Sequence, residues 1–312
     1  MRVVDFWKVV VGGDKERLVD CAPNVRNLNQ KFRVGGRIDS VLGHLLSTGH
    51  PDVEAVDLLF NHGVRIDRTL IKSHCLFRAI EQHETGLLKI LLDNGAEPDC
   101  LDENGCTPLI VAACFRDHVS TQLLLAKNAD TNIGDNEGNT ALSNATSCYC
   151  FTAASLLARH GVDMECNANA CALVWACAMV GFKTAFLFAE MLLKNGADPN
   201  KVVSDDNEVF NDRSALFYCT ENGFESDMVH LTELMLQNGG DPWRRTPLGM
   251  PFMHAFMEEN ISLLFLFLRY SGDILSDPAH LLDALNGGRP RATPGPRKGS
   301  VSLSSGVSNA RR

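Results

Sequence analysis

Apolar residues along the chain gather in short segments that end at a glycine or an asparagine. Several of these segments contain a Leu-Leu pair just before the end residue, as in Leu91-Leu92-Asp93-Asn94-Gly95. Glycine and asparagine readily adopt the positive φ that terminates a helix. The end residues lie about 32 to 35 positions apart, with one longer interval before Gly239, and the spacing predicts seven similar helix ends. They are Gly63, Gly95, Asn128, Gly161, Gly196, Gly239 and Gly272.

A second signal lies about twenty-one residues before each end residue. It is clearest at Thr107-Pro108-Leu109 and weaker at Thr140-Ala141-Leu142. A threonine side chain can cap the amides of a first helical turn, and proline fits the first helical position because its missing N–H would have no partner there. Each repeat is therefore predicted to contain two helices. We call the capping position the Thr column, which comprises Ser40, His74, Thr107, Thr140, Cys171, Ser214 and Met250.

These segments resemble the ankyrin repeat, whose signature is Thr-Pro-Leu-His in the first helix and a Gly-Ala-Asp-Pro-Asn-like turn after the second. Gly196-Ala197-Asp198-Pro199-Asn200 matches the turn, whereas no copy keeps the signature histidine. The resemblance covers roughly residues 3 to 277 and is strongest between 87 and 200. It implies an all-α ankyrin-repeat solenoid of about seven to eight helix-turn-helix repeats with short β-hairpin or turn connections.

The same frame divides the chain into an array over residues 1–286 and a tail over 287–312. A closing helix is expected at 278–286, because a terminal repeat must present one polar face to water. The tail is rich in Pro, Gly, Ser and Arg, so it buries too little apolar surface to fold and is predicted to be disordered. The approximate repeats are 3–36, 37–70, 71–103, 104–136, 137–167, 168–210, 211–246 and 247–277.

Two neighbouring repeats are longer than the others. Cys171 to Gly196 and Ser214 to Gly239 each span twenty-five positions, four more than the shortest repeats. Four residues are about one helical turn, which predicts a longer second helix or a longer inter-helix loop on the side away from the hairpins. The hairpin between Asn200 and Arg213 is also lengthened. Its acidic residues are either a drifted insertion or a contact for a basic partner, and they include Asp205, Asp206 and Glu208.

The ankyrin resemblance also implies a partner-binding groove formed by hairpin tips and by the ends of the first helices. The end positions lie seven and eight residues after the Thr column. Phe115 and Met179 are candidates for an apolar anchor surrounded by polar positions, although Met179 is equally consistent with burial against neighbouring helices. The groove positions are Glu81, Gln82, Cys114, Phe115, Ser147, Cys148, Ala178, Met179, Glu221, Asn222, Met257 and Glu258.

Charge and motifs exclude several classes of function. The net charge of the chain is −9, and the tail contributes six cations with no acid, so the rest carries −9 − 6 = −15. Such an acidic body argues against nucleic-acid binding, which needs clustered Lys and Arg. No nucleophile-elbow, phosphate-loop or zinc-protease motif occurs, so neither an enzyme nor a cofactor is predicted.

The cysteines Cys148, Cys150, Cys166, Cys171 and Cys177 lie within thirty residues but lack Cys-x-x-Cys spacing. Cys177 and Cys219 occupy alanine positions of the repeat, which favours small core residues over a metal site.

Three residues are candidates for modification. Asn132 and Asn200 fit the Leu-x5-Asp-x-Asn pattern that asparagine hydroxylases use on ankyrin hairpins, although consensus repeats keep these residues for structural reasons. Ser300 follows Arg297-Lys298-Gly299, a sequence similar to a basic-directed kinase site.

The leading functional hypothesis is a non-catalytic scaffold or adaptor that binds a partner protein, which we expect to have a basic surface. The alternative is the substrate-recognition subunit of a ubiquitin ligase, although residues 277–285 are too short for a ligase-recruiting box. No secretory signal or apolar run of about 18 residues is apparent, which predicts a cytoplasmic or nuclear protein that does not enter a membrane. We expect the protein to be a monomer.

Overall fold

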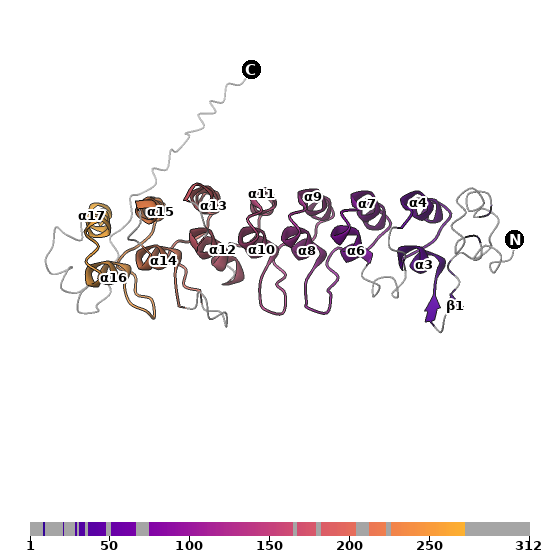
Figure 1. The fold of residues 1–312 in the computed structure, drawn as a ribbon, viewed down its shortest axis with the longest axis horizontal. Coiled ribbons are helices and arrows are strands. Elements are labelled where there is room, and N and C mark those ends of the chain that lie inside the picture. Colours follow the sequence, from indigo (N-terminus) through magenta and orange to yellow (C-terminus); the bar gives the residue numbers. More distant parts are fainter. Residues whose placement is uncertain are drawn as a thin grey trace, which may run out of the picture.

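The chain folds into a single row of antiparallel helix pairs (Figure 1). In this computed structural model the described residues are 9, 21, 29, 31–34, 37–47, 51–66, 75–164, 167–178, 182–203, 212–222 and 226–271. The first helices are α3 (Val41–Ser47), α6 (Cys75–Glu81), α8 (Pro108–Cys114), α10 (Ala141–Ser147), α12 (Asn167–Ala178), α14 (Ala215–Glu221) and α16 (Pro251–Met257). The second helices are α4 (Val53–Asn61), α7 (Thr85–Asp93), α9 (His118–Ala126), α11 (Phe151–Arg159), α13 (Phe182–Lys194), α15 (Ser226–Gln237) and α17 (Ile261–Tyr270).

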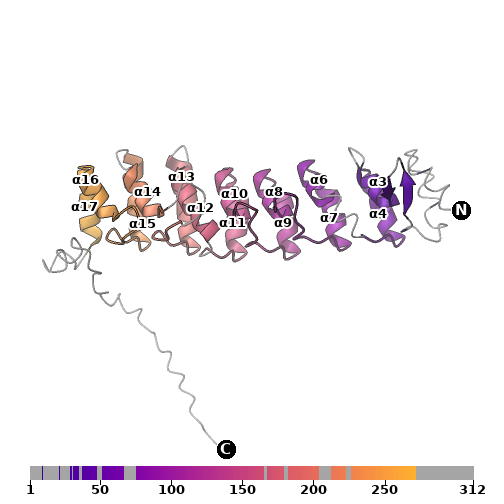
Figure 2. The same ribbon diagram turned by 90° about the horizontal axis from the view of Figure 1, so that it is seen from below.

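Each described helix pair packs mainly on the pair before it and the pair after it. From α6 onward each first helix contacts the next first helix, and from α4 onward each second helix contacts the next second helix. The two kinds of helix therefore form two layers (Figure 1), which overlap when the row is seen from below (Figure 2). One continuous apolar core runs between the layers from Val41 to Phe267. This architecture confirms the predicted all-α ankyrin-repeat solenoid. The predicted repeat boundaries remain predictions, and the closing helix and the tail lie outside the described residues.

The helix ends follow the predicted signals. Gly95, Gly161 and Gly196 all have positive φ, and Asn128 has φ +60°. Gly63 and Gly239 behave in the same way, whereas Gly272 lies outside the described residues. The hydroxyl oxygens of Thr107, Thr140 and Ser214 accept backbone N–H groups of the first turns of α8, α10 and α14, as the capping argument requires.

The fifth of the first helices, α12, departs from its predicted start. α12 begins at Asn167, four residues before Cys171 of the Thr column. Its sequence there is Asn-Ala-Asn-Ala without proline, and alanine favours continued helix over a cap. The two long repeats have second helices of 13 and 12 residues, compared with nine in α7 and α9, so the prediction of a longer second helix is confirmed.

Hairpin-type connections project from the layer of first helices (Figure 1). Strands β1 (Phe32–Val34) and β2 (Arg37–Asp39) pair antiparallel, and residues 102–106 and 135–139 close shorter turns through backbone hydrogen bonds. Adjacent turns touch, since the Asn136 N–H donates to the Asn104 carbonyl at 3.1 Å. Glycine is favoured at position 105, because its φ is +76° and a Cβ there would lie only 3.0 Å from the backbone nitrogen of Asn136.

A recurring side-chain bond links several of the turns to the next turn along the array. The Oδ1 atoms of Asn132 and Asn200 accept the backbone N–H groups of Asp163 and Asp241, at 2.9 and 2.6 Å. Asp99 accepts the Asp130 N–H in the same way at 2.9 Å. Near the amino terminus, Asn29 makes the equivalent bond to Arg65 at 2.8 Å, which places residue 29 in the turn of a repeat that precedes α3.

Candidate binding groove

The predicted groove positions lie at the carboxyl ends of the first helices, on the layer that also bears the hairpins (Figure 1). Glu81, Phe115 and Asn222 are exposed, as are Cys114, Met257 and Glu258. The side chains of Gln82, Ser147, Cys148, Ala178 and Glu221 are half-buried. Met179 and the acidic residues Asp205, Asp206 and Glu208 lie outside the described residues, so their contribution remains a prediction.

Phe115 is the most prominent apolar side chain at the central groove positions. It caps the end of α8 and is 47% exposed. Its ring meets that of His83 from the preceding repeat edge-on, with the ring centroids 6.4 Å apart. His83 Nδ1 lies 3.6 Å from Asp117 Oδ2. This chain of contacts holds a half-exposed aromatic ring in place, which is the arrangement expected of an anchor for a partner.

Asp117 supports this cluster from inside the array. Its carboxylate caps α9 by accepting the N–H groups of Val119 and Ser120, and it also accepts the Ser120 hydroxyl at 2.6 Å. Burial alone would raise the pKa of Asp117, but the hydrogen bonds from Ser120 and the proximity of His83 outweigh it, so this pKa lies below the usual aspartate value. The ionised carboxylate therefore fixes both the start of α9 and the position facing His83.

The turns between the first and second helices contain a second set of groove residues. His83, Arg116, Tyr149 and Glu259 each lie nine residues after the Thr column and have φ between +55° and +59°. Such values are costly for residues other than glycine, and they tend to persist where a side chain is functionally needed. These residues immediately follow the predicted groove positions, so the repeat frame could have located them, but without a glycine nothing in the sequence marks the turn.

The hairpins after α7 and α9 give the central groove a negative charge. Residues 97–106 contain four acids and residues 129–139 contain three, and neither segment contains a Lys or Arg. Asp102 and Asp135 also have a structural role, because each accepts two backbone N–H groups of its own turn. Glu103 and Glu137 are exposed at the tips. Burial, followed by the charges of Asp102, Asp135 and Glu137, raises the pKa of Cys106 to about 11.

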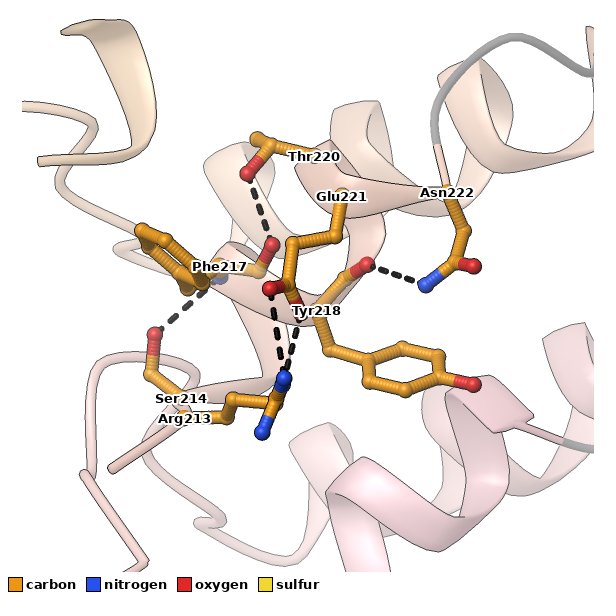
Figure 3. Close-up of polar contacts among 7 residues, drawn as sticks. All are labelled: Arg213, Ser214, Phe217, Tyr218, Thr220, Glu221 and Asn222. Carbon is orange, nitrogen blue, oxygen red and sulfur yellow. Dashed lines mark hydrogen bonds and ion pairs between the residues drawn. The ribbon is translucent and has the colours of Figure 1, made fainter. Parts of the chain in front are cut away.

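Glu221 does not add to this negative charge. Its carboxylate accepts hydrogen bonds from Arg213 Nε at 2.7 Å and Nη2 at 3.4 Å, and both side chains are about three-quarters buried (Figure 3). Beside it, the Asn222 side-chain amide donates to the Tyr218 carbonyl. The groove around α14 therefore presents a neutralised ion pair, whereas the hairpins at 97–106 and 129–139 contain acids and no Lys or Arg.

The predicted core cysteines and modification sites have distinct surroundings. Cys177 and Cys219 are fully buried, and contact with the Cys219 thiol, followed by burial, raises the pKa of Cys177 well above its usual value. They therefore pack as small core residues with unreactive thiols. Asn132 is exposed, whereas Asn200 is buried with both side-chain polar atoms hydrogen-bonded. Hydroxylation at either residue remains a prediction, and Ser300 lies outside the described residues.

Among residues whose placement is described, no helix is both long and apolar enough to cross a bilayer. Within those same ranges, no three His, Cys, Asp or Glu side chains gather in a way that could hold a metal ion.

Comparison with known sequences identifies the repeats. The family described as ankyrin repeats (3 copies) matches residues 76–169 and 118–202. Ankyrin repeat protein FPV031 of fowlpox virus (strain NVSL) is 31% identical over 119 residues, which are 36% of this chain. The match spans only 35% of that viral protein, about a third of its length.

Solved structures agree in fold. An ankyrin repeat domain from Acinetobacter baumannii AYE superposes with a TM-score of 0.55 at 21% identity, covering 64% of this chain and 98% of that domain. The ankyrin repeat domain of Bcl-3, a member of the IkappaB family, gives a TM-score of 0.56 at 21% identity, covering 69% and 93%. Ankyrin repeats are in general modules for protein–protein interaction and are typically non-enzymatic.

Proposed function

Because the chain belongs to the ankyrin-repeat family, we propose that it is a non-catalytic scaffold that binds a partner protein through the central groove. The groove is formed by the ends of α8 and α10 and by the hairpins at 97–106 and 129–139. The observation that carries the proposal is the half-exposed ring of Phe115 beside two hairpins that hold seven acids and no cation. A fitting partner segment has an apolar side chain for Phe115 and Lys or Arg residues on either side.

The positions of the charges support this choice of partner. Glu103 and Glu137 are exposed on neighbouring hairpins, and the hairpins are joined by the bond from Asn136 to Asn104. Tyr149, 42% exposed, lies in the next inter-helix turn after Phe115. An aromatic centre with a charged rim is common in protein interfaces, where the aromatic contact contributes affinity and the charges increase the association rate.

The proposal is tested by affinity purification with the full chain as bait, followed by binding measurements on recovered direct partners. Phe115→Ala is expected to weaken binding by about 30-fold, as a hot-spot residue does. Glu103→Lys with Glu137→Lys is expected to slow association roughly tenfold at low salt and less at high salt.

The matched control is Gln122→Ala, an exposed position on α9 in the layer of second helices. The control should bind like the wild type. Partners that bind the wild type and both groove variants equally would contradict the proposed groove.

A further inference from the structure

The last described helix has two apolar faces. On α17, Leu263, Leu266 and Phe267 are buried in the core. A second face is formed by residues at i, i+3, i+4 and i+7, namely Ile261, Leu264, Phe265 and Leu268. Ile261 and Phe265 are 66% and 70% exposed. A helix that is apolar on both faces is normally covered on both, so α17 lacks a covering element on one side in the described structure.

The exposed phenylalanine differs from the equivalent residues of four other second helices. Phe265 is the fifth residue after the N-cap of its helix. At the same position α4, α7, α9 and α11 have polar residues, namely Asp57, Lys89, Gln122 and Ser155. A solvent-facing surface accounts for those four residues but not for Phe265.

Positions that face the following repeat show the same difference. In α8, α10 and α14 the sixth residue after the N-cap is only 0 to 1% exposed, because another repeat follows and covers it. These residues are Ala113, Thr146 and Thr220. In α16 this residue is Phe256, which is 59% exposed. Leu264 and Leu268 are half-buried, whereas their equivalents Leu88 and Leu92 in α7 are at most 5% exposed. We call Phe256, Leu264, Phe265 and Leu268 the end face.

We propose that residues 277–286 of the same chain, which lie outside the described residues, form a short helix that covers the end face. Asp277-Pro278 is a helix-start sequence, and Leu281, Leu282 and Leu285 fall on one side of the helix that follows. His280, Asp283 and Asn286 fall on the other side, which suits a terminal element with one wet face.

The length of chain after α17 favours this occupant over a second molecule. From Ser271 at the end of α17 to Asp277 is six residues, which reach up to about 20 Å, while packed helices lie only roughly 10 Å apart. Between Asn128 and Thr140 the chain uses twelve residues, which include a hairpin. The six residues from Ser271 to Asp277 are too few for such a hairpin but long enough to bring a helix to the end face. A tethered segment also has a local concentration in the millimolar range, which disfavours competitors in solution.

Hydrogen exchange of the full chain tests the proposal independently of any partner. Leu281→Asp with Leu282→Asp should accelerate amide exchange in α16 and α17 by at least about tenfold, because the covering helix is lost. The control His280→Asp with Asn286→Asp also adds two acids, but on the solvent-facing side of the proposed helix. It should leave the amide exchange of α16 and α17 unchanged. Amides of α8 to α11 should exchange as in the wild type in both variants, which shows that the array stays folded.

Two results would overturn the proposal. The first is wild-type exchange in α16 and α17 of the Leu281→Asp, Leu282→Asp variant. The second is light scattering that shows the wild type to be a dimer and Phe265→Ser a monomer, because a second copy would then occupy the end face. If the proposal holds, adding the two Leu substitutions to a Phe256→Ala, Phe265→Ala variant should cause little further acceleration, since both changes remove the same contact.

Discussion

Replacing Arg116 by glycine is expected to stabilise the array although it removes a long side chain. Arg116 lies in the turn between α8 and α9 with φ +57°, and its N–H donates to the Ala113 carbonyl at 3.1 Å. The left-handed conformation costs a residue with a Cβ about 1–2 kcal/mol. Glycine avoids that cost but loses roughly 0.5–1 kcal/mol more conformational entropy on folding. Because Arg116 is exposed, its lost contacts are few, and the net gain should be about 0.5–1 kcal/mol.

Urea unfolding of the wild type, Arg116→Gly and Arg116→Ala isolates the conformational effect. Alanine removes the same side chain but keeps the Cβ, so it should be no more stable than the wild type, and glycine should exceed alanine by about 1 kcal/mol at an unchanged slope. If Arg116→Gly is no more stable than Arg116→Ala, the conformational reasoning is wrong. If it is more stable and also binds the partner less well, the turn residue is retained for binding at the expense of stability.

Three further experiments test other parts of the structure. Asn200→Ala should lower the free energy of unfolding by about 1–3 kcal/mol, because it leaves a backbone amide and a carbonyl of the next repeat without their side-chain partner. A loss below about 0.5 kcal/mol would show that these hydrogen bonds do not stabilise the array. Asp117→Asn should lower the free energy of unfolding at pH 7. Because the folded pKa of Asp117 is lowered, the stability difference from the wild type should shrink as the pH falls below the unfolded pKa of about 4. A stability difference that grows toward acidic pH would contradict this prediction. A double-mutant cycle of Arg213→Ala and Glu221→Ala should give a coupling of about 0.5–1 kcal/mol, and zero coupling would show that the partly buried pair contributes nothing.

The helix pairs could be predicted because each repeat carries local signals for its own ends. Thr107 and Thr140 cap first helices, and Gly95 and Asn128 end second helices, through contacts within a few residues. The four extra residues of the two long repeats could be counted from the sequence, but the count left open a longer second helix or a longer loop, and the structure shows the longer helix. Such features depend on neighbours along the chain, which the sequence shows directly.

The details of the groove depend on contacts between repeats and were largely missed. The ring contact between His83 and Phe115 joins two repeats, and the Arg213–Glu221 pair depends on how the preceding hairpin returns to α14. The positive φ of Tyr149 has no residue-type signal, because tyrosine is not a turn residue. The place of Phe115 at the end of its first helix could be predicted because the helix frame alone sets it, and its role as a groove residue stays a prediction.

The most direct test of the central claim is a hydrogen-exchange footprint of the chain with and without a direct partner recovered by affinity purification. The proposed function predicts protection of the hairpins at 97–106 and 129–139 and of the turns around Phe115 and Tyr149. It also predicts little change in the second helices α7, α9 and α11. Protection confined to those second helices, with both hairpins unchanged, would contradict binding through the central groove.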